Sequence, residues 1–296
     1  MLESDARLRS GEKLAVALSR VGLDELDSLE AQIPGVIEDR DREYLHRFRV
    51  ALRRSRALLK TLEPFLSAAA QGHKEALKWL AGATGLLRDL DVHELEMASW
   101  AQPDSALEAV LAEIQRERGV AHANLSELLA GQRCRDVLAG WRQFLLALPR
   151  ESCPASSLRL RQMLPGLLKS LCRRMRKRGG RIGPSSADSE LHRLRIHGKR
   201  LRYTLEAFAP VLSRRGRVQR LLGALKDLQT VLGDHQDQVV AADYFRVLAR
   251  RPGLFSPALF ESGRWVRELE LRQQASRSDF PRHFAGFARA SRRAFP

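Results

Sequence analysis

The sequence predicts an all-α protein in which two sequence-related four-helix bundles pack with pseudo-two-fold symmetry around a basic groove or pore. The composition favours helices, because only 6% of the residues are aromatic, 44% are hydrophobic, and Leu, Ala, Arg and Glu dominate. Hydrophobic residues recur with the period of an α-helix from about Leu14 to Gln274, and no segment alternates convincingly with the period of a strand. An internal repeat divides the single domain into an N-terminal helical half, 1–148, and a C-terminal helical half, 149–296.

Short clusters of Pro, Gly and polar residues interrupt the helical pattern and separate about eight main helices. Asp104, which follows Pro103, and Ser189, which precedes Glu190, are expected to cap helix starts. The tail after Phe280 is only weakly patterned. The interruptions lie at residues 33–35, 102–104, 148–149 and 179–184.

Each half of the chain carries two motifs in the same order. Tyr44–Leu66 (YLHRFRVALRRSRALLKTLEPFL) and Glu190–Leu212 (ELHRLRIHGKRLRYTLEAFAPVL) align at an offset of 146 and share nine residues. Trp79–Asp89 and Asp227–Asp237 follow them at an offset of 148. Two unrelated helices would not share this many positions, so the halves are copies of one helical unit.

These motif pairs resemble the paired signature of the CHAD family, the conserved-histidine α-helical domains. LHRFRVALRRSR is followed by LLRDLDV, and LHRLRIHGKRLRYTLE by LQTVLGDHQD, so the likeness runs from about Tyr44 to Val240. The resemblance implies a pair of four-helix bundles around a basic cavity that holds inorganic polyphosphate, and it implies no reaction. Two positions depart from the family pattern: Ser55, where the second repeat has Leu201, and Gly198, which interrupts a helix.

The charge of the chain independently indicates a polyanionic partner. The formal net charge is +16 and the isoelectric point is about 10.8, and a surface this positive attracts nucleic acid, anionic lipid or polyphosphate. Residues 150–230 hold 20 Lys and Arg against 5 Asp and Glu, a net charge of +15. Nearly all of the excess charge therefore lies in this segment, and the rest of the chain is close to neutral.

Basic residues follow helical spacing in both copies of the first motif. Neighbouring members are three or four residues apart, which places them in one band along a helix, and the first band spans roughly 20 Å at 1.5 Å per residue. The first stripe is His46, Arg49, Arg53, Arg56 and Lys60. The second stripe is His192, Arg195, Lys199 and Arg202.

Both stripes border the predicted core. Leu45, Phe48 and Leu52 occupy the adjacent sector of the first helix, and Leu191 and its neighbours do so in the second. A run of charges is ordinarily a solvated helix face, but cations aligned beside a core repel one another and lose hydration. Glu206 is the only acid within the stripes, so a polyanionic ligand accounts for these charges better than internal pairing.

We therefore predict a groove that is lined by the two LHRxR helices and binds polyphosphate. Arg binds phosphate oxygens bidentately and Lys acts as a point charge, so an Arg-rich groove suits a chain of phosphates. The predicted binding residues are His46, Arg49, Arg53, Arg56, Lys60, His192, Arg195, Lys199, Arg202, Tyr203, Lys169, Arg173, Arg220 and Lys226.

No catalytic or cofactor signature accompanies the stripes, since the sequence lacks GxxxxGK[ST], GxGxxG and GxSxG. His46 and His192 could in principle form symmetric metal sites with Asp89 and Asp237. No HxH or HExxH spacing supports this, so we expect buried or phosphate-contacting histidines, and aspartates that anchor arginines or helix ends. The expectation is a non-enzymatic protein without cofactor or metal.

Two other functions remain open. The basic segment would bind nucleic acid weakly and nonspecifically, although only Tyr203 sits beside a stripe and the stacking platform of single-strand binders is missing. A metal-dependent phosphohydrolase ranks third, because it needs a carboxylate-rich site that a basic groove does not offer.

The cysteines and the hydropathy indicate the compartment. Cys134, Cys153 and Cys172 are widely spaced without a CxxC pair, which argues against a disulfide framework or a zinc site and fits a reducing compartment. The sequence shows no signal peptide, and no apolar run approaches the ~20 residues of a membrane span. We expect a soluble cytoplasmic protein without a membrane partner, associated with polyphosphate granules.

Overall fold

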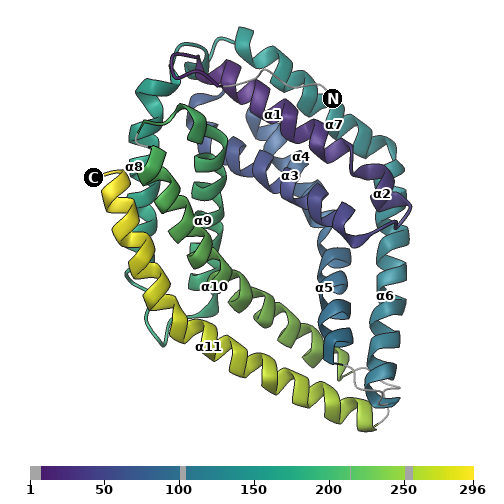
Figure 1. Cartoon of the computed structure of the whole chain (residues 1–296). Helices are drawn as coiled ribbons and strands as arrows, with labels where there is room; N and C mark the ends of the chain where they lie inside the picture. Colours follow the sequence, from purple (N-terminus) through teal and green to yellow (C-terminus); the bar gives the residue numbers. More distant parts are fainter. Residues whose placement is uncertain (1–7, 101–104, 214, 251–255) are drawn as a thin grey trace. The chain divides into compact units, whose positions relative to one another are not determined.

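The computed structural model describes residues 8–100, 105–213, 215–250 and 256–296 (Figure 1). It confirms the all-α prediction, since these ranges contain no strand and only one isolated bridge, between Lys13 and Arg159. No helix within them is long and apolar enough to cross a membrane. The α-helices are α1 (Leu14–Glu30), α2 (Ile33–Ile37), α3 (Arg42–Leu62), α4 (Ala70–Ala83), α5 (Gly85–Trp100), α6 (Ser105–Ala130), α7 (Gln132–Ala147), α8 (Leu160–Gly179), α9 (Asp188–Phe208), α10 (Arg215–Leu248) and α11 (Ser256–Ala294).

Most of the predicted interruptions are found. Pro34 lies in the first turn of the short α2, and Pro149 lies in a 3-10 helix, where its missing N–H does no harm. The glycine-rich stretch 179–184 ends α8 and opens the loop that leads to α9. The interruption expected at 102–104, with the Asp104 cap, lies outside the described residues.

One expectation about a helix end is wrong, and one helix extends past the residues where the sequence pattern is clear. α9 begins at Asp188, so Ser189 lies inside the helix and does not cap it, because Asp188 is held at the helix start by hydrogen bonds from His235 and Arg277. The weakly patterned tail is helical to Ala294. It is stabilised by a stripe of buried or half-buried residues that the sequence pattern did not reveal: Phe280, Phe284, Phe287, Ser291 and Ala294.

α3 carries the first stripe, and its local sequence explains its start and its orientation. The Asp41 side chain accepts a hydrogen bond of 2.9 Å from the backbone N–H of Glu43, which satisfies a donor of the first turn. Leu45, Phe48 and Leu52 are buried, as predicted, so the apolar sector fixes which side of α3 faces the core.

The chain forms two compact units, which do not coincide with the sequence halves. Unit 1 comprises residues 1–88, 120–170 and 200–218. Unit 2 comprises residues 89–119, 171–199 and 219–296. Each unit therefore combines segments of both halves, and α9 contributes its first part to unit 2 and its last part to unit 1. The pseudo-two-fold packing of two four-helix bundles stays a prediction.

In unit 1, helices α1, α3, α4 and α7 pack together around an aromatic cluster. Trp141 is 2% exposed and stacks on Phe144 with ring centroids 5.4 Å apart. His73 packs against both rings, and burial lowers its pKa, so this histidine behaves as a neutral aromatic residue of the core.

In unit 2, Phe245 is fully buried and His93 stacks on Tyr244 at 4.6 Å between ring centroids. Burial lowers the pKa of His93 to about 4. Gly198 lies in the middle of α9, where a Cβ atom would come within 2.9 Å of the Met175 terminal methyl group. The missing Cβ therefore lets α9 approach the flexible end of the Met175 side chain closely.

The three cysteines, Cys134, Cys153 and Cys172, are free thiols. Burial raises the pKa of Cys172 to about 12, so this thiol stays protonated and inert.

Candidate functional site

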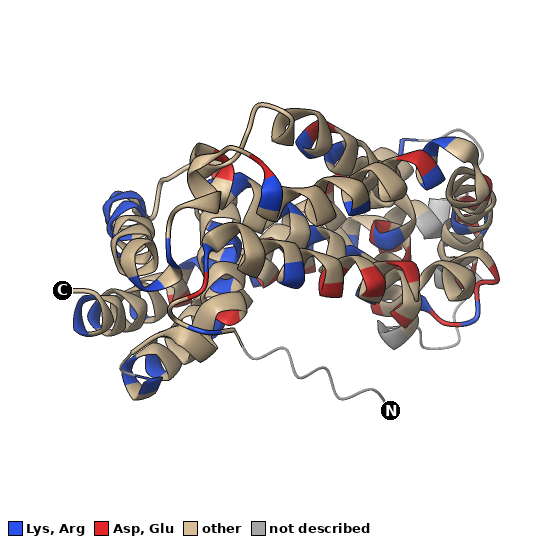
Figure 2. Cartoon of the chain, turned by 90° about the horizontal axis from the view of Figure 1, so that it is seen from above, with Lys and Arg blue, Asp and Glu red and all other residues tan. Residues whose placement is uncertain are grey.

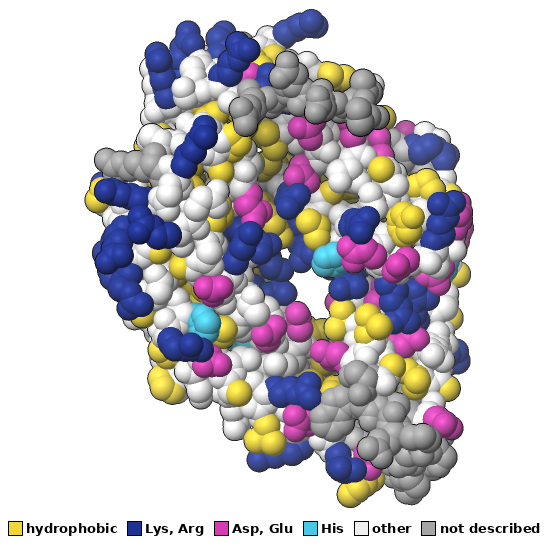
Figure 3. Space-filling model, viewed as in Figure 1, with side chains coloured by type: hydrophobic (Ala, Val, Ile, Leu, Met, Phe, Trp, Pro, Cys, Tyr) yellow, Lys and Arg dark blue, Asp and Glu magenta, His cyan; other side chains and the backbone are white. Residues whose placement is uncertain are grey.

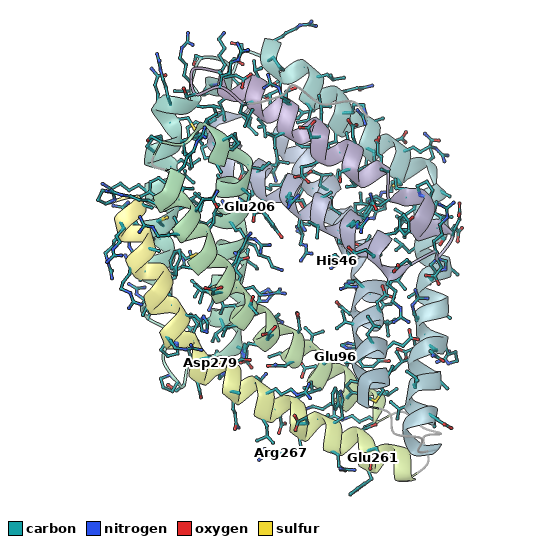
Figure 4. All side chains as sticks on the ribbon, viewed as in Figure 1. His46, Glu96, Glu206, Glu261, Arg267 and Asp279 are labelled. Carbon is teal, nitrogen blue, oxygen red and sulfur yellow. The ribbon has the colours of Figure 1, made fainter. Side chains whose placement is uncertain are left out.

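The first stripe runs along α3, which is continuous from Arg42 to Leu62. Its spacing of three and four residues places its members on one side of the helix. Four members, including the labelled His46 in Figure 4, are half-buried, and Lys60 is exposed. The prediction that these basic residues border the core is confirmed by the burial of the neighbouring leucines.

Arg49 is held against the end of α4. Its Nη1 donates to Thr84 Oγ1 at 2.7 Å and to the carbonyl oxygen of Ala81 at 3.3 Å. Thr84 is itself fully buried and donates to the same carbonyl at 3.0 Å. These hydrogen bonds fix the guanidinium in position beside the stripe.

Arg53 and Arg56 are half-buried, and no carboxylate in the described part of the chain lies within ion-pair distance of either. Arg53 Nε donates to the backbone carbonyl of Arg49 at 3.2 Å. Burial lowers the pKa of Arg56, and only the more distant charge of Glu75 opposes this. Two such cations less than one turn apart destabilise each other in the absence of an anion.

His46 differs from its neighbours because it carries no charge at neutral pH. Burial lowers its pKa, and the cations Arg88, Arg53 and Arg47 lower it further, while Glu43 opposes them. A neutral imidazole offers one N–H donor and one acceptor. His46 therefore gives the stripe a hydrogen-bond donor that becomes a cation only in acid.

Lys60 is compensated within the chain. Its Nζ lies 2.6 Å from Glu63 Oε2, and Lys74 Nζ lies 2.6 Å from Glu63 Oε1. These hydrogen bonds lower the pKa of Glu63 to about 2. The expectation that a polyanionic ligand accounts for the stripe charges better than internal pairing therefore does not hold for Lys60, because Glu63 lies three residues beyond the stripe and pairs with it.

The last part of α9 packs on α3 within unit 1. Arg200 Nη2 donates to the carbonyl oxygen of Lys60 at 3.3 Å, and Thr204 Oγ1 lies 3.5 Å from Thr61 Oγ1 in the buried contact. Sequence reasoning aligned Arg200 with Arg54 but assigned neither to the site. Both repeats have an arginine at this position, and this was the sequence signal that pointed to these two residues.

Arg202 and Tyr203 belong to this contact, and Glu206, labelled in Figure 4, is their acidic neighbour. Arg202 Nε lies 3.7 Å from Glu206 Oε1, and Arg54 Nη2 lies 4.0 Å from Glu206 Oε2. Tyr203 is only 4% exposed, and its hydroxyl accepts a hydrogen bond of 3.3 Å from Arg202. Tyr203 therefore orients the guanidinium of Arg202 from inside the core.

In unit 2, the second stripe meets the second motif of its own repeat. His192 Nδ1 forms a hydrogen bond with Gln236 Oε1, and Arg195 Nη2 donates to Asp237 Oδ1 at 3.2 Å. The prediction that Asp237 anchors an arginine is confirmed. Arg88, the residue of the first repeat that corresponds to Gln236, likewise lies near the first-repeat histidine, in unit 1.

The structure divides the predicted binding residues between the two units. Unit 1 holds His46, Arg49, Arg53, Arg56, Lys60, Lys169, Arg202 and Tyr203. Unit 2 holds Arg173, His192, Arg195, Lys199, Arg220 and Lys226. Lys169, Arg173, Arg220 and Lys226 are exposed. A single groove lined by both stripes stays a prediction.

Carboxylates in unit 2 near the second motif are shifted toward their neutral forms. Burial raises the pKa of Glu96, labelled in Figure 4, and of Asp234, and the charge of Asp237 raises both further. No group of three or more His, Cys, Asp or Glu side chains among the described residues is placed to hold a metal ion. The donors at the stripes are guanidinium, ammonium and imidazole groups, which suit anions.

Lys and Arg also gather at the C-terminal end of α11, in unit 2 (Figure 2, Figure 3). The sequence did not indicate this cluster, because the net charge of all residues outside 150–230, taken together, is close to zero. The exposed arginines there are Arg282, Arg289, Arg292 and Arg293.

The sequence and the fold of this chain are similar to those of known proteins. The CHAD domain family matches residues 21–246 of the chain. The crystal structure of the CHAD domain from the plant Ricinus communis is similar with a TM-score of 0.79 and 26% sequence identity, over 97% of this chain and 96% of that one. PptA from Streptomyces chartreusis shares the fold, with a TM-score of 0.68 and 16% identity over 93% of this chain and 100% of that one. No curated protein sequence is significantly similar.

Proposed function

Because the chain belongs to the CHAD domain family, whose match covers residues 21–246, we propose that it binds inorganic polyphosphate along its two stripes without hydrolysing it. The observation that carries the proposal is the state of Arg53 and Arg56. Both are half-buried, neither has a carboxylate within ion-pair distance in the described chain, and they lie on one side of α3. An anion that neutralises them removes a cost that the free protein bears.

The dimensions of the first stripe favour an extended ligand. His46 to Lys60 spans roughly 20 Å of helix, which is long enough for several phosphates of a chain. Interactions with successive phosphates combine, because the first contact raises the effective concentration of the next. A polymer therefore contacts the whole stripe at once and binds more tightly than orthophosphate.

Binding without hydrolysis fits the state of the acids beside the stripes. Glu63 is held by two lysines, and Asp237 accepts a hydrogen bond from Arg195. Glu206 lies within 4.0 Å of Arg54 and Arg202. Each acid is thus engaged by a cation instead of being grouped with others as metal ligands. Bound polyphosphate would also place the protein on polyphosphate granules in the cytoplasm.

A competition experiment tests the identity of the ligand. The protein is titrated with long-chain polyphosphate, and the complex is then challenged with single-stranded RNA at the same phosphate concentration. Buried Tyr203 offers no surface for stacking bases, so we expect RNA to compete poorly. Equal competition by RNA would support the nonspecific nucleic-acid binder instead.

A further inference from the structure

Unit 2 contains a pocket of about 210 Å³ that the stripes do not include. Its lining residues come from the end of α8, the start of α9 and the turn between them, and this turn runs beside α11 (Figure 1). The lining residues are Arg178, Arg181, Ile182, Glu190, Arg193 and Leu194. We propose that this pocket is a second anion site, which binds pyrophosphate or another compact anion carrying two adjacent phosphates.

Three arginines line the pocket from three consecutive pieces of chain. Arg178 lies in the last turn of α8, Arg181 follows in the loop, and Arg193 lies in the second turn of α9. Leu194, which also lines the pocket, is buried in unit 2. A short segment of sequence thus surrounds one small volume with three arginines.

The loop that carries Arg181 is fixed in place. Arg277 of α11 donates to the carbonyl oxygen of Ser186 at 2.8 Å and to that of Pro184 at 3.4 Å. Gly179 packs so closely on Phe284 that a Cβ atom would lie 2.1 Å from its ring. The pocket is therefore preorganised, which reduces the entropy lost on binding.

The charge of the pocket is positive and uncompensated. No carboxylate in the described residues lies within ion-pair distance of Arg178, Arg181 or Arg193, including Glu190 in the same lining. Arg178 donates to Nε2 of His197. Three guanidinium groups against one carboxylate leave a net positive site, and guanidinium forks match adjacent phosphate oxygens.

The size of the pocket selects a small ligand. Its volume of about 210 Å³ lies below the roughly 300–1,000 Å³ that accommodates drug-sized molecules. Ile182 and Leu194 are the two apolar residues of the lining, which is too little apolar surface to enclose a nucleotide base. A diphosphate group is small enough for this volume and matches its positive charge. This proposal concerns unit 2 only and does not depend on the polyphosphate stripe.

Calorimetric titration with pyrophosphate tests the site in the full chain. The double variant Arg181→Ala/Arg193→Ala should lose affinity at least roughly tenfold, because each charge-assisted hydrogen bond contributes strongly. Arg289→Ala/Arg292→Ala removes the same charge from exposed positions of α11 in the same unit and should change the affinity less than twofold. Equal losses in both double variants would overturn the proposal, because net charge alone would then explain binding.

Two further variants sharpen the test. Glu190→Gln removes the only acid in the lining and should strengthen pyrophosphate binding severalfold; a weaker or unchanged affinity would count against the site. Arg53→Ala/Arg56→Ala should leave pyrophosphate binding intact while weakening long-chain polyphosphate. Loss of pyrophosphate binding in this stripe variant, with the pocket variant unaffected, would place the diphosphate on α3 and refute the pocket.

Discussion

Arg200 Nη2 donates a hydrogen bond of 3.3 Å to the carbonyl oxygen of Lys60, at the contact between the two helices that carry the repeated motif. The offset of 146 makes Arg200 the equivalent of Arg54, and Glu206 the equivalent of Lys60. Arg54 in turn lies 4.0 Å from Glu206. Each of the two equivalent arginines therefore reaches the corresponding residue of the other helix, Arg200 at a backbone carbonyl and Arg54 at a side-chain carboxylate.

Two glycine substitutions should have opposite effects on stability. Gly198→Ala places a methyl group against the flexible end of Met175, so the gain in helix propensity should leave stability unchanged or raised by up to about 1 kcal/mol. Gly179→Ala drives a methyl group into the Phe284 ring and should destabilise the protein by about 1–3 kcal/mol. Urea denaturation of both variants measures the difference, and a loss of stability in Gly198→Ala would contradict the packing described for α9.

Removing a stripe cation should stabilise the free protein. Arg56→Met keeps the apolar stem of the side chain and removes a partly desolvated charge that has no carboxylate within ion-pair distance. We expect the free energy of unfolding to rise by up to about 1 kcal/mol, because the desolvation cost disappears. In saturating polyphosphate the parent protein should become more stable than the variant, because ligand binding raises the thermal stability of the parent protein more. A variant that is less stable in both conditions would contradict this view of Arg56.

Polyphosphate affinity should rise as the pH falls below about 6.5, the ordinary pKa of histidine. In the free protein, burial and nearby arginines hold the pKa of His46 below that value. A bound polyanion favours the protonated imidazole and therefore raises the pKa of His46, so binding takes up protons. Between the two pKa values, each unit by which the pH falls strengthens binding up to tenfold. Titrations from pH 7.5 to 5 measure this dependence. His46→Gln should flatten it, and a slope that persists in this variant would assign the proton to another group.

The protein should release no orthophosphate from polyphosphate in the presence of Mg²⁺. The acids beside the stripes are engaged by cations, and the stripe along α3 consists of guanidinium, ammonium and imidazole groups. A phosphate-release assay over several hours provides the measurement. Sustained turnover that disappears in Asp237→Ala would contradict binding without hydrolysis.

The sequence predicted the helical class, the repeat and the apolar sector of α3, because these depend on periodicity within one segment. It did not reveal the helical tail, in which tertiary packing buries Phe280 and Phe287 and half-buries Phe284. It also missed the pairing of Lys60 with Glu63 and the pocket of Arg178, Arg181 and Arg193, since both depend on side-chain positions across helix ends. The compact units could not be read from the repeat, because α9 divides between them.

The salt dependence of polyphosphate binding tests the central claim most directly. Each phosphate charge neutralised by the protein adds roughly 0.7–0.9 to the slope of log affinity against log salt. Arg53→Ala/Arg56→Ala should therefore reduce this slope by about 1.5 and weaken binding strongly. Arg150→Ala/Arg161→Ala removes two exposed charges of unit 1 outside the stripe and should leave the slope nearly unchanged. Equal reductions in the two double variants would show that net charge, and not the stripe of α3, binds polyphosphate.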